Sequence, residues 1–202
     1  MPPSNVTPEE LSLVAQAAAG DREARRALFE RYREAAFRTA LRIVRREADA
    51  VDIVQDAFIR AFERLADFQQ DASFQTWLMR IVSNRSLDVL RSRKVRLAAS
   101  LDGDEDGGGV AAGLAADEEP PEAGLERREL GERLASAIAS LPTEQRVVFA
   151  LFATGELTYA QIAEVVGIPI GTVMSRIFHA RKKLGQMLPD LAAAFAQARP
   201  RE

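Results

Sequence analysis

The segment Leu157–Leu184, LTYAQIAEVVGIPIGTVMSRIFHARKKL, decides the fold of the C-terminal part of this chain. Thr158 and Gln161 form the Thr-x-x-Gln pattern of a capping box, which predicts that a helix begins there. Gly167 is the residue type that ends helices in a left-handed conformation, and Pro169 prevents the first helix from continuing. The segment therefore predicts two helices joined by a tight turn.

The second helix of this pair, which we expect to begin at residues 170–172, has two different faces. Apolar residues recur at spacings of four, three and four, as in the buried stripe of an amphipathic helix. Four cations lie between Arg176 and Lys183 with no acid among them, so an ordinary helical hairpin with a solvated face is the less favoured alternative. A helix-turn-helix that binds DNA fits better, because varied side chains can contact base edges while basic ones contact phosphates. The apolar stripe is Val173, Ile177, Ala180 and Leu184, and the opposite face holds Met174, Ser175, Phe178, His179 and Lys182, flanked by Arg176, Arg181 and Lys183.

Composition excludes several classes of function. The chain has 202 residues, of which 47% are hydrophobic and 28% charged, as is usual for soluble proteins. No apolar run approaches the roughly 20 residues of a membrane helix, and the start MPPSNVTPEE does not resemble a signal peptide, so we expect a cytoplasmic protein. The absence of cysteine and the single histidine argue against disulfides and a structural zinc site, and we expect no metal and no cofactor.

Residues 97–126 differ from the rest of the chain. They hold nine acids, no lysine or arginine and six of the twelve glycines, and without these nine acids the formal charge of −3 becomes +6. Such a composition cannot bury enough apolar surface to fold, so we predict a flexible acidic linker. It separates an N-terminal unit, residues 7–96, from a C-terminal unit, residues 127–189, with residues 190–202 as a tail.

The N-terminal unit is predicted to be helical throughout. Thr7 and Pro8 begin one helix that Gly20 ends, and three more are expected at about residues 21–46, 49–66 and 73–94. Polar and acidic residues crowd the first two turns of the third helix. From this pattern alone, stabilisation of the helix dipole and a binding surface are equally good interpretations. These residues are Asp49, Asp52, Gln55 and Asp56.

The fourth helix changes character along its length. Its first half has core spacing that includes Trp77, whereas residues 80–96 contain six cations and one acid, which predicts a second nucleic-acid surface. Phe68, in the loop before this helix, is a better candidate than Trp77 for contact with an unstacked base, although covering the core is the commoner role of such a residue. The outward residues are Arg80, Asn84, Asp88 and Arg91, with Arg85, Arg93, Lys94 and Arg96 beside them.

Several motifs in one order make the chain resemble the extracytoplasmic-function (ECF) group of the bacterial sigma-70 family. The resemblance covers nearly the whole chain. It implies an all-α fold of two small helical domains, sigma regions 2 and 4, joined by the linker. The matching motifs are DAVDIVQDAFIRAF (49–62), SFQTWLMRIVSNRSLDVLRSRK (73–94), LPTEQRVVFAL (141–151) and TYAQIAEVVGIPIGTVMSRIFHARKKL (158–184).

The resemblance also implies partners and residue roles. Core RNA polymerase would bind the acidic face of the third helix through Asp49, Asp52, Gln55 and Asp56. An anti-sigma factor is a further expected partner, whereas a small-molecule substrate and direct membrane insertion are not expected. The −10 promoter element, opened to single strands, would contact Phe68, Arg80, Asn84, Arg85, Asp88, Arg91, Arg93 and Lys94. The −35 element, as duplex, would contact Thr172, Met174, Ser175, Arg176, Phe178, His179, Arg181 and Lys182.

Two positions depart from the family pattern, and one other class of function remains open. Met174 stands where many relatives have a charged residue, and His179 where a basic one is common, so the −35 sequence is expected to differ. The chain has no catalytic constellation, which predicts that it is not an enzyme. The alternative is an autonomous helix-turn-helix regulator that binds an operator as a dimer, although the basic fourth helix is then unexplained.

Overall fold

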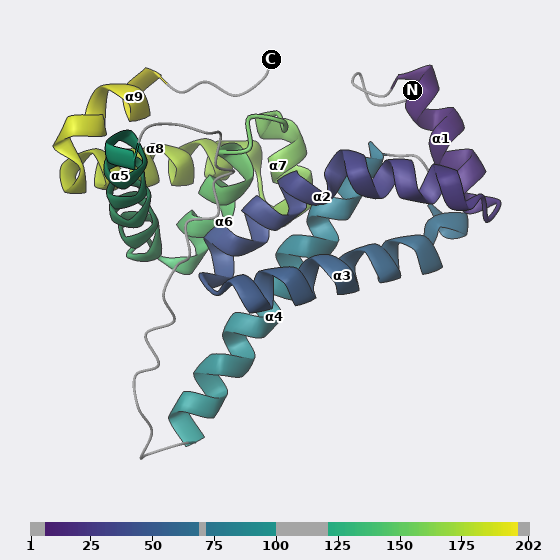
Figure 1. Cartoon of the computed structure of the whole chain (residues 1–202), viewed down its shortest axis with the longest axis horizontal. Helices are drawn as coiled ribbons and strands as arrows, with labels where there is room; N and C mark the ends of the chain where they lie inside the picture. Colours follow the sequence, from purple (N-terminus) through teal and green to yellow (C-terminus); the bar gives the residue numbers. More distant parts are fainter. Residues whose placement is uncertain (1–6, 69–71, 100–120, 198–202) are drawn as a thin grey trace.

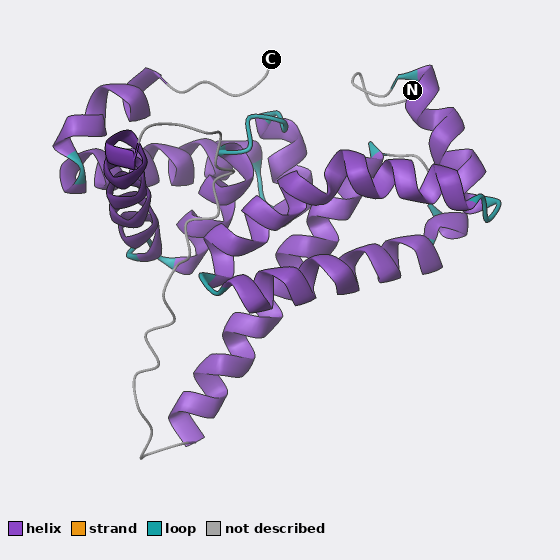
Figure 2. Ribbon diagram, viewed as in Figure 1, coloured by secondary structure: helices purple, strands orange, loops and turns teal. Residues whose placement is uncertain are grey.

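In a computed structural model of the chain, residues 7–68, 72–99 and 121–197 are described, and all regular structure in these ranges is helical (Figure 2). This confirms the predicted all-α class. The helices, in order, are α1 (Pro8–Ala18), α2 (Arg22–Val44), α3 (Glu47–Glu63), η1 (Leu65–Asp67), α4 (Phe74–Ala99), α5 (Pro121–Ala139), α6 (Thr143–Phe152), α7 (Tyr159–Val166), α8 (Ile170–Met187), η2 (Pro189–Leu191) and α9 (Ala192–Gln197).

Side-chain caps fix where the N-terminal helices begin. The Thr7 hydroxyl accepts a hydrogen bond from the Glu10 amide at 3.2 Å, which satisfies one of the free amides at the start of α1. Asp21 caps α2 in the same way, since its carboxylate accepts from the Glu23 amide at 2.8 Å and the Ala24 amide at 3.1 Å. The end of α2 is unusual, because Arg45 occupies the left-handed region with φ 69°.

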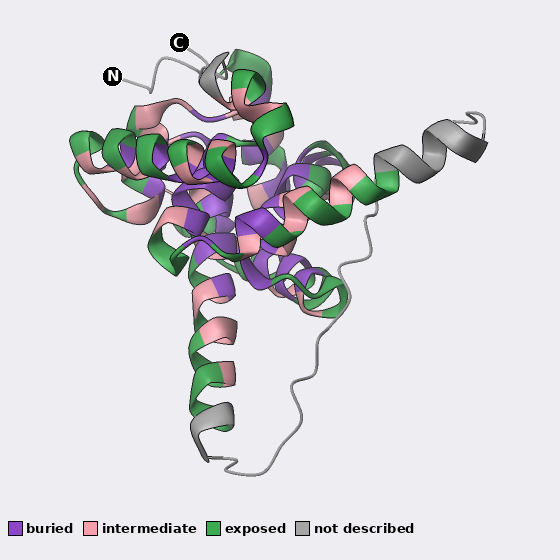
Figure 3. Ribbon diagram, turned by 90° about the vertical axis from the view of Figure 1, so that its left-hand side faces the viewer, coloured by how far each residue is buried: buried purple, intermediate pink, exposed green. Residues whose placement is uncertain are grey.

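The N-terminal unit is a bundle in which α2, α3 and α4 pack on one another and α1 packs on α2 (Figure 1). Its centre contains Leu28, Ile43, Ile53, Phe74 and Leu78, each no more than 2% exposed. The buried faces of the helices point inward and the exposed faces outward, as Figure 3 shows. Burial of these side chains is the main stabilising contribution to the bundle.

The C-terminal unit is built on α6, α7 and α8. Its core includes Leu151, Ile162, Ile177 and Leu184, each no more than 1% exposed. Helix α9 packs against α8. No single helix in the described ranges is long and apolar enough to cross a membrane; α7 and α8 reach the required length and composition only as a pair, and they are bent by 102°.

The two units lie against each other, which the sequence did not predict. Helix α2 packs on α6 and α4 packs on α7, so segments far apart in the sequence lie side by side (Figure 1). Gln75 on α4 donates a hydrogen bond to the Glu156 carboxylate, just before α7. The buried side chains of both units form one continuous core.

Several helices differ from the predicted ones, and α3 ends at Glu63 instead of near residue 66. Helix α4 continues to Ala99, beyond the expected end near Lys94. Helix α5 begins at Pro121, inside the range expected to be linker, because proline is well suited to the first turn and good helix formers follow it. Helix α9 lies in the range expected to be a tail. Residues 100–120, the greater part of the expected linker, lie outside the described residues.

Candidate nucleic-acid and protein interfaces

The turn between α7 and α8 has the geometry that the sequence predicts. The Thr158 hydroxyl accepts from the Gln161 amide at 3.2 Å, and the Gln161 side chain accepts from the Thr158 amide at 2.8 Å, so the capping box is complete. Gly167 ends α7 in the left-handed conformation with φ 72°. The 102° bend between the two helices is within the range of helix-turn-helix motifs. The predicted motif is therefore confirmed.

Helix α8 buries its predicted stripe and exposes the opposite face. Val173, Ile177, Ala180 and Leu184 are at most 1% exposed. Thr172 is half-buried, and the other predicted base-facing residues are exposed. These are Met174, Ser175, Phe178 and His179.

The cations of α8 differ in how far they are free to contact DNA. Arg176 forms an ion pair with Glu144 at the start of α6. Arg181 donates to the backbone oxygen of Phe195. Lys182 is exposed, and the Lys183 ammonium donates to the Ser140 carbonyl at 2.8 Å. Contacts within the C-terminal unit thus orient three of these four side chains.

A shallow hollow lies beside the exposed face of α8. Its volume is about 290 Å³, and its lining comes from α8 and from the segment around the start of α6. Two lysines give it a positive charge suited to a phosphate group. The lining residues are Pro142, Gln145, His179, Lys182, Lys183 and Gln186.

Helix α4 presents the second predicted surface. Phe68 precedes this helix and packs against the core. Its ring centroid is 5.0 Å from that of Trp77 and 6.5 Å from that of Phe74. Both Phe68 and Trp77 are half-buried, so the two rings form one partly exposed aromatic cluster. The exposed polar residues of α4 up to residue 96 are Arg80, Asn84, Asp88, Arg91, Ser92, Lys94 and Arg96.

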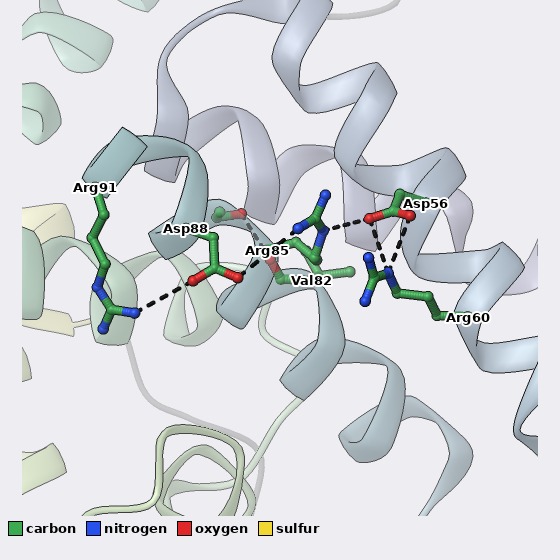
Figure 4. Close-up of polar contacts among 7 residues, drawn as sticks. Asp56, Arg60, Val82, Arg85, Asp88 and Arg91 are labelled. Atoms are coloured by element: carbon green, nitrogen blue, oxygen red, sulfur yellow. Dashed lines mark hydrogen bonds and ion pairs between the residues drawn. The ribbon is translucent and has the colours of Figure 1, made fainter. Parts of the chain in front are cut away.

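The acidic face of α3 is divided into free and paired residues. Asp52 and Gln55 are exposed. Asp56, in contrast, pairs with Arg60 at 3.1 Å and with Arg85 of α4, as Figure 4 shows. Asp49 pairs with Arg93 of α4. The predicted polymerase-binding face of α3 and the predicted −10-binding face of α4 are therefore joined by ion pairs. The sequence did not predict these pairs, because they depend on how α3 and α4 are aligned in the folded protein.

The α4 side of this network is also fixed. Asp88 lies 3.9 Å from Arg85 and 3.3 Å from Arg91, so it holds two cations on the outer surface (Figure 4). Arg93 donates to the Val44 carbonyl at 3.0 Å. Burial, together with nearby Arg46 and Arg96, lowers the pKa of the Arg93 guanidinium below its usual value. Among the predicted −10 cations, Arg85 and Arg93 are thus tied to α3, while Arg80 and Lys94 are exposed.

Two arginines, buried Arg146 and half-buried Arg42, were not predicted as special positions. Arg146 on α6 is 7% exposed and donates to the Ala139 carbonyl at 3.1 Å. Burial, with Arg45 nearby, lowers its pKa, and burial with Arg38 nearby does the same for Arg42. In the sequence these residues look like ordinary helix-surface cations, so no local signal distinguishes them.

Comparison with protein families identifies both units. Residues 28–96 match the model of sigma-70 region 2, and residues 131–184 match the model of sigma-70 region 4. The first range contains α4 as far as residue 96, and the second contains the helix-turn-helix as far as residue 184. The two regions occur in the order that the motifs indicated.

Curated relatives and a solved structure extend the match to most of the chain. The chain is 33% identical over 180 residues to the ECF RNA polymerase sigma factor SigW of Bacillus subtilis, covering 88% of this chain and 96% of SigW. It is 37% identical over 178 residues to the RNA polymerase sigma factor CnrH of Cupriavidus metallidurans, covering 87% of this chain and 92% of CnrH. The structure of CnrH in complex with the cytosolic domain of CnrY superposes with a TM-score of 0.65 at 29% identity, covering 90% of this chain and 97% of that chain.

A second solved structure, also a complex, is similar to this chain in fold only. The sigma factor RpoE bound to the anti-sigma factor NepR from Bartonella quintana matches with a TM-score of 0.59 at 21% identity, over 90% of this chain and 94% of that chain.

Taken together, the two matched regions and the relatives aligned over nearly their full length show that this chain belongs to the ECF group of the sigma-70 family and has a sigma factor's role in transcription initiation.

Proposed function

We propose that this sigma factor binds core RNA polymerase, contacts the −35 and −10 promoter elements and promotes strand opening at the −10 element for transcription initiation. The observation that carries the proposal is the presence, in one packed chain, of an exposed helix-turn-helix face, a second basic helix and an acidic helix beside it. An operator-binding regulator needs only the first of these.

Duplex contact at −35 is assigned to α8. Its exposed first turns offer side chains of different chemistry to the base edges of a major groove, and exposed Lys182 offers a charge to the phosphates. The basic hollow beside His179 lies on the same surface. Contacts to phosphates would set the position of the helix, and contacts to base edges would set the sequence preference.

Single-stranded contact at −10 is assigned to α4 and the loop before it. Arg80 and Asn84 are exposed on α4, and the aromatic cluster of Phe68 and Trp77 precedes them. Capture of an unstacked base offsets an opening cost of a few kcal/mol per base. Binding energy, rather than chemistry by this chain, would therefore drive opening, and the polymerase would form the phosphodiester bonds.

Polymerase contact is assigned mainly to the exposed part of α3. Asp52 and Gln55 are exposed, whereas the carboxylates of Asp49 and Asp56 already neutralise arginines of α4. Asp52 is thus the better residue at which to test the interface. By similarity to CnrH with CnrY and to RpoE with NepR, an anti-sigma factor is proposed as the partner that restrains the chain.

Run-off transcription with purified core polymerase, with and without the chain, tests the whole proposal. We expect discrete start sites only when the chain is present, each preceded by one asymmetric pair of elements. Absence of such starts, together with protection of a palindromic site by the chain alone, contradicts the proposal and supports an operator-binding regulator.

A charge reversal tests the polymerase interface separately. Asp52→Lys is expected to weaken binding to core polymerase by about tenfold or more, because it places a cation where the partner would meet an acid. Glu63→Lys is the matched control: it makes the same charge change on the same helix, about 16 Å further along its axis. Equal binding by both variants would remove Asp52 from the interface.

A further inference from the structure

An exposed row of large apolar side chains runs along the first half of α8. Ile170, Met174 and Phe178 are 48%, 51% and 62% exposed, and they follow one another at intervals of four residues, one helical turn apart. They are three of the seven large apolar side chains that are exposed in the described part of the chain. Packing does not require them, because the opposite stripe of α8 supplies the core.

The surroundings of this row favour a polyanion as its partner. Ser175, His179 and Lys182 are exposed beside it, and the basic hollow of about 290 Å³ shares His179 and Lys182. An apolar protein surface would have to bury these polar and charged groups, which is costly without partners. A DNA major groove instead combines phosphates at its edges with one apolar group at its floor, the C5-methyl of thymine.

We propose that Met174 and Phe178 contact thymine methyl groups in the −35 element, and that Met174 makes this chain indifferent to guanine at a position where an arginine would select it. The proposal rests on the proposed −35 role of α8 and deepens it. The rise between the two residues is about 6 Å, or roughly two base-pair steps of 3.4 Å. The two thymines should therefore lie within about two base pairs of each other.

The chemistry of the two side chains supports this preference. Methionine has no hydrogen-bond donor, so it cannot make the bidentate contact by which arginine recognises guanine. The Phe178 ring lies edge-to-face with His179 at a centroid distance of 5.5 Å, which limits the conformations it can take. A guanine or cytosine edge facing this row would be left without a partner, and an unpaired buried polar group lowers affinity.

Replacement of thymine by deoxyuridine is the direct test, because it removes only the methyl group. The −35 sequence is first selected from a promoter library by run-off transcription with the unmodified chain and core polymerase. Each thymine in the selected element is then replaced in turn. We expect two positions at which the replacement lowers the affinity of the holoenzyme for the promoter. The expected loss is about fourfold, which is the contribution of burying one methyl group.

Variants assign each thymine to a side chain. Met174→Arg should select guanine at one of the two positions and abolish the deoxyuridine effect there, and Phe178→Ala should abolish it at the other. Met187→Ala is the matched control, because Met187 is 44% exposed on the same helix but lies beyond the row. It should leave both effects unchanged.

Failure of this proposal is distinct from failure of the proposed function. If start sites depend on the chain but every deoxyuridine duplex binds as well as its thymine parent, the methyl contacts are absent and the row is a protein-facing surface. That result comes from the unmodified chain, so it does not depend on the folding of any variant. If no start depends on the chain at all, the sigma factor role fails first.

Discussion

Single residues in this chain often serve a tertiary contact that their type does not suggest. Asp49 and Asp56 resemble ordinary acids at a helix start, yet each pairs with an arginine of the next helix. Arg146 resembles a surface cation, yet it is buried and donates to a backbone carbonyl. Residue type therefore indicates the chemistry that is available, while burial and partners decide how it is used.

Arg45 offers a prediction at this scale. It ends α2 with φ 69°, a conformation that costs a residue with a side chain roughly 1 kcal/mol and that glycine adopts freely. Arg45→Gly is therefore expected to raise the free energy of unfolding by about 1 kcal/mol, also because it removes a charge near buried Arg146. Urea denaturation should show a higher midpoint with an unchanged slope.

The neighbouring arginine is the control for this prediction. Arg46 has φ −120°, which any residue adopts, so Arg46→Gly should give no gain in stability. Equal stabilisation by both substitutions would mean that loss of positive charge, rather than relief of the backbone conformation, is the cause.

At the scale of helices, α3 and α4 are held together by ion pairs between their side chains. Two ion pairs hold the acidic and basic faces next to each other: Asp56 with Arg85 (Figure 4) and Asp49 with Arg93. The Asp49 and Arg93 side chains are each 24% exposed, so their pair is better shielded from solvent than the typical surface pair. This pairing positions the basic residues of α4 before any partner binds.

A comparison of two aspartates on α3 separates structural from binding roles. Asp49→Asn should lower the free energy of unfolding by about 1 kcal/mol, because it leaves half-buried Arg93 without its acid. Asp52→Asn, at an exposed position, should change stability little. Thermal denaturation of both variants checks this. A larger loss with Asp52→Asn would show that the pairing with α4 contributes little to stability.

At the scale of the whole molecule, the two units share one buried core and the contact between Gln75 and Glu156. Cooperative unfolding is expected of such an arrangement. The single tryptophan, Trp77, lies in the N-terminal unit and gives a fluorescence signal from that unit alone, whereas circular dichroism follows the helices of both.

The two signals should therefore change together on heating. Glu156→Ala, a change in the C-terminal unit, should lower the Trp77 transition by the equivalent of about 1 kcal/mol, because it removes the hydrogen bond with Gln75. Glu164→Ala, at an exposed position on α7, is the control and should leave it unchanged. Separate transitions in fluorescence and circular dichroism would show that the units unfold independently. A Trp77 transition that Glu156→Ala leaves unchanged would show the same.

Local sequence determined the elements and the helix-turn-helix of this protein. The caps at Thr7, Asp21 and Thr158, the turn at Gly167 and the apolar spacing in α8 each act over a few residues, so pattern and propensity predict them. The order of the motifs likewise indicated the family. The residues of the α8 exposed face were predicted because a buried stripe fixes what lies opposite to it.

Only the tertiary structure decided how these elements share their residues. It paired Asp49 and Asp56 with α4, tied Arg176 to Glu144 and placed the two units in contact. These outcomes depend on the register and distance between helices that are far apart in sequence, and no local pattern encodes them. A charged residue exposed on its own helix is free or paired according to what the fold places beside it.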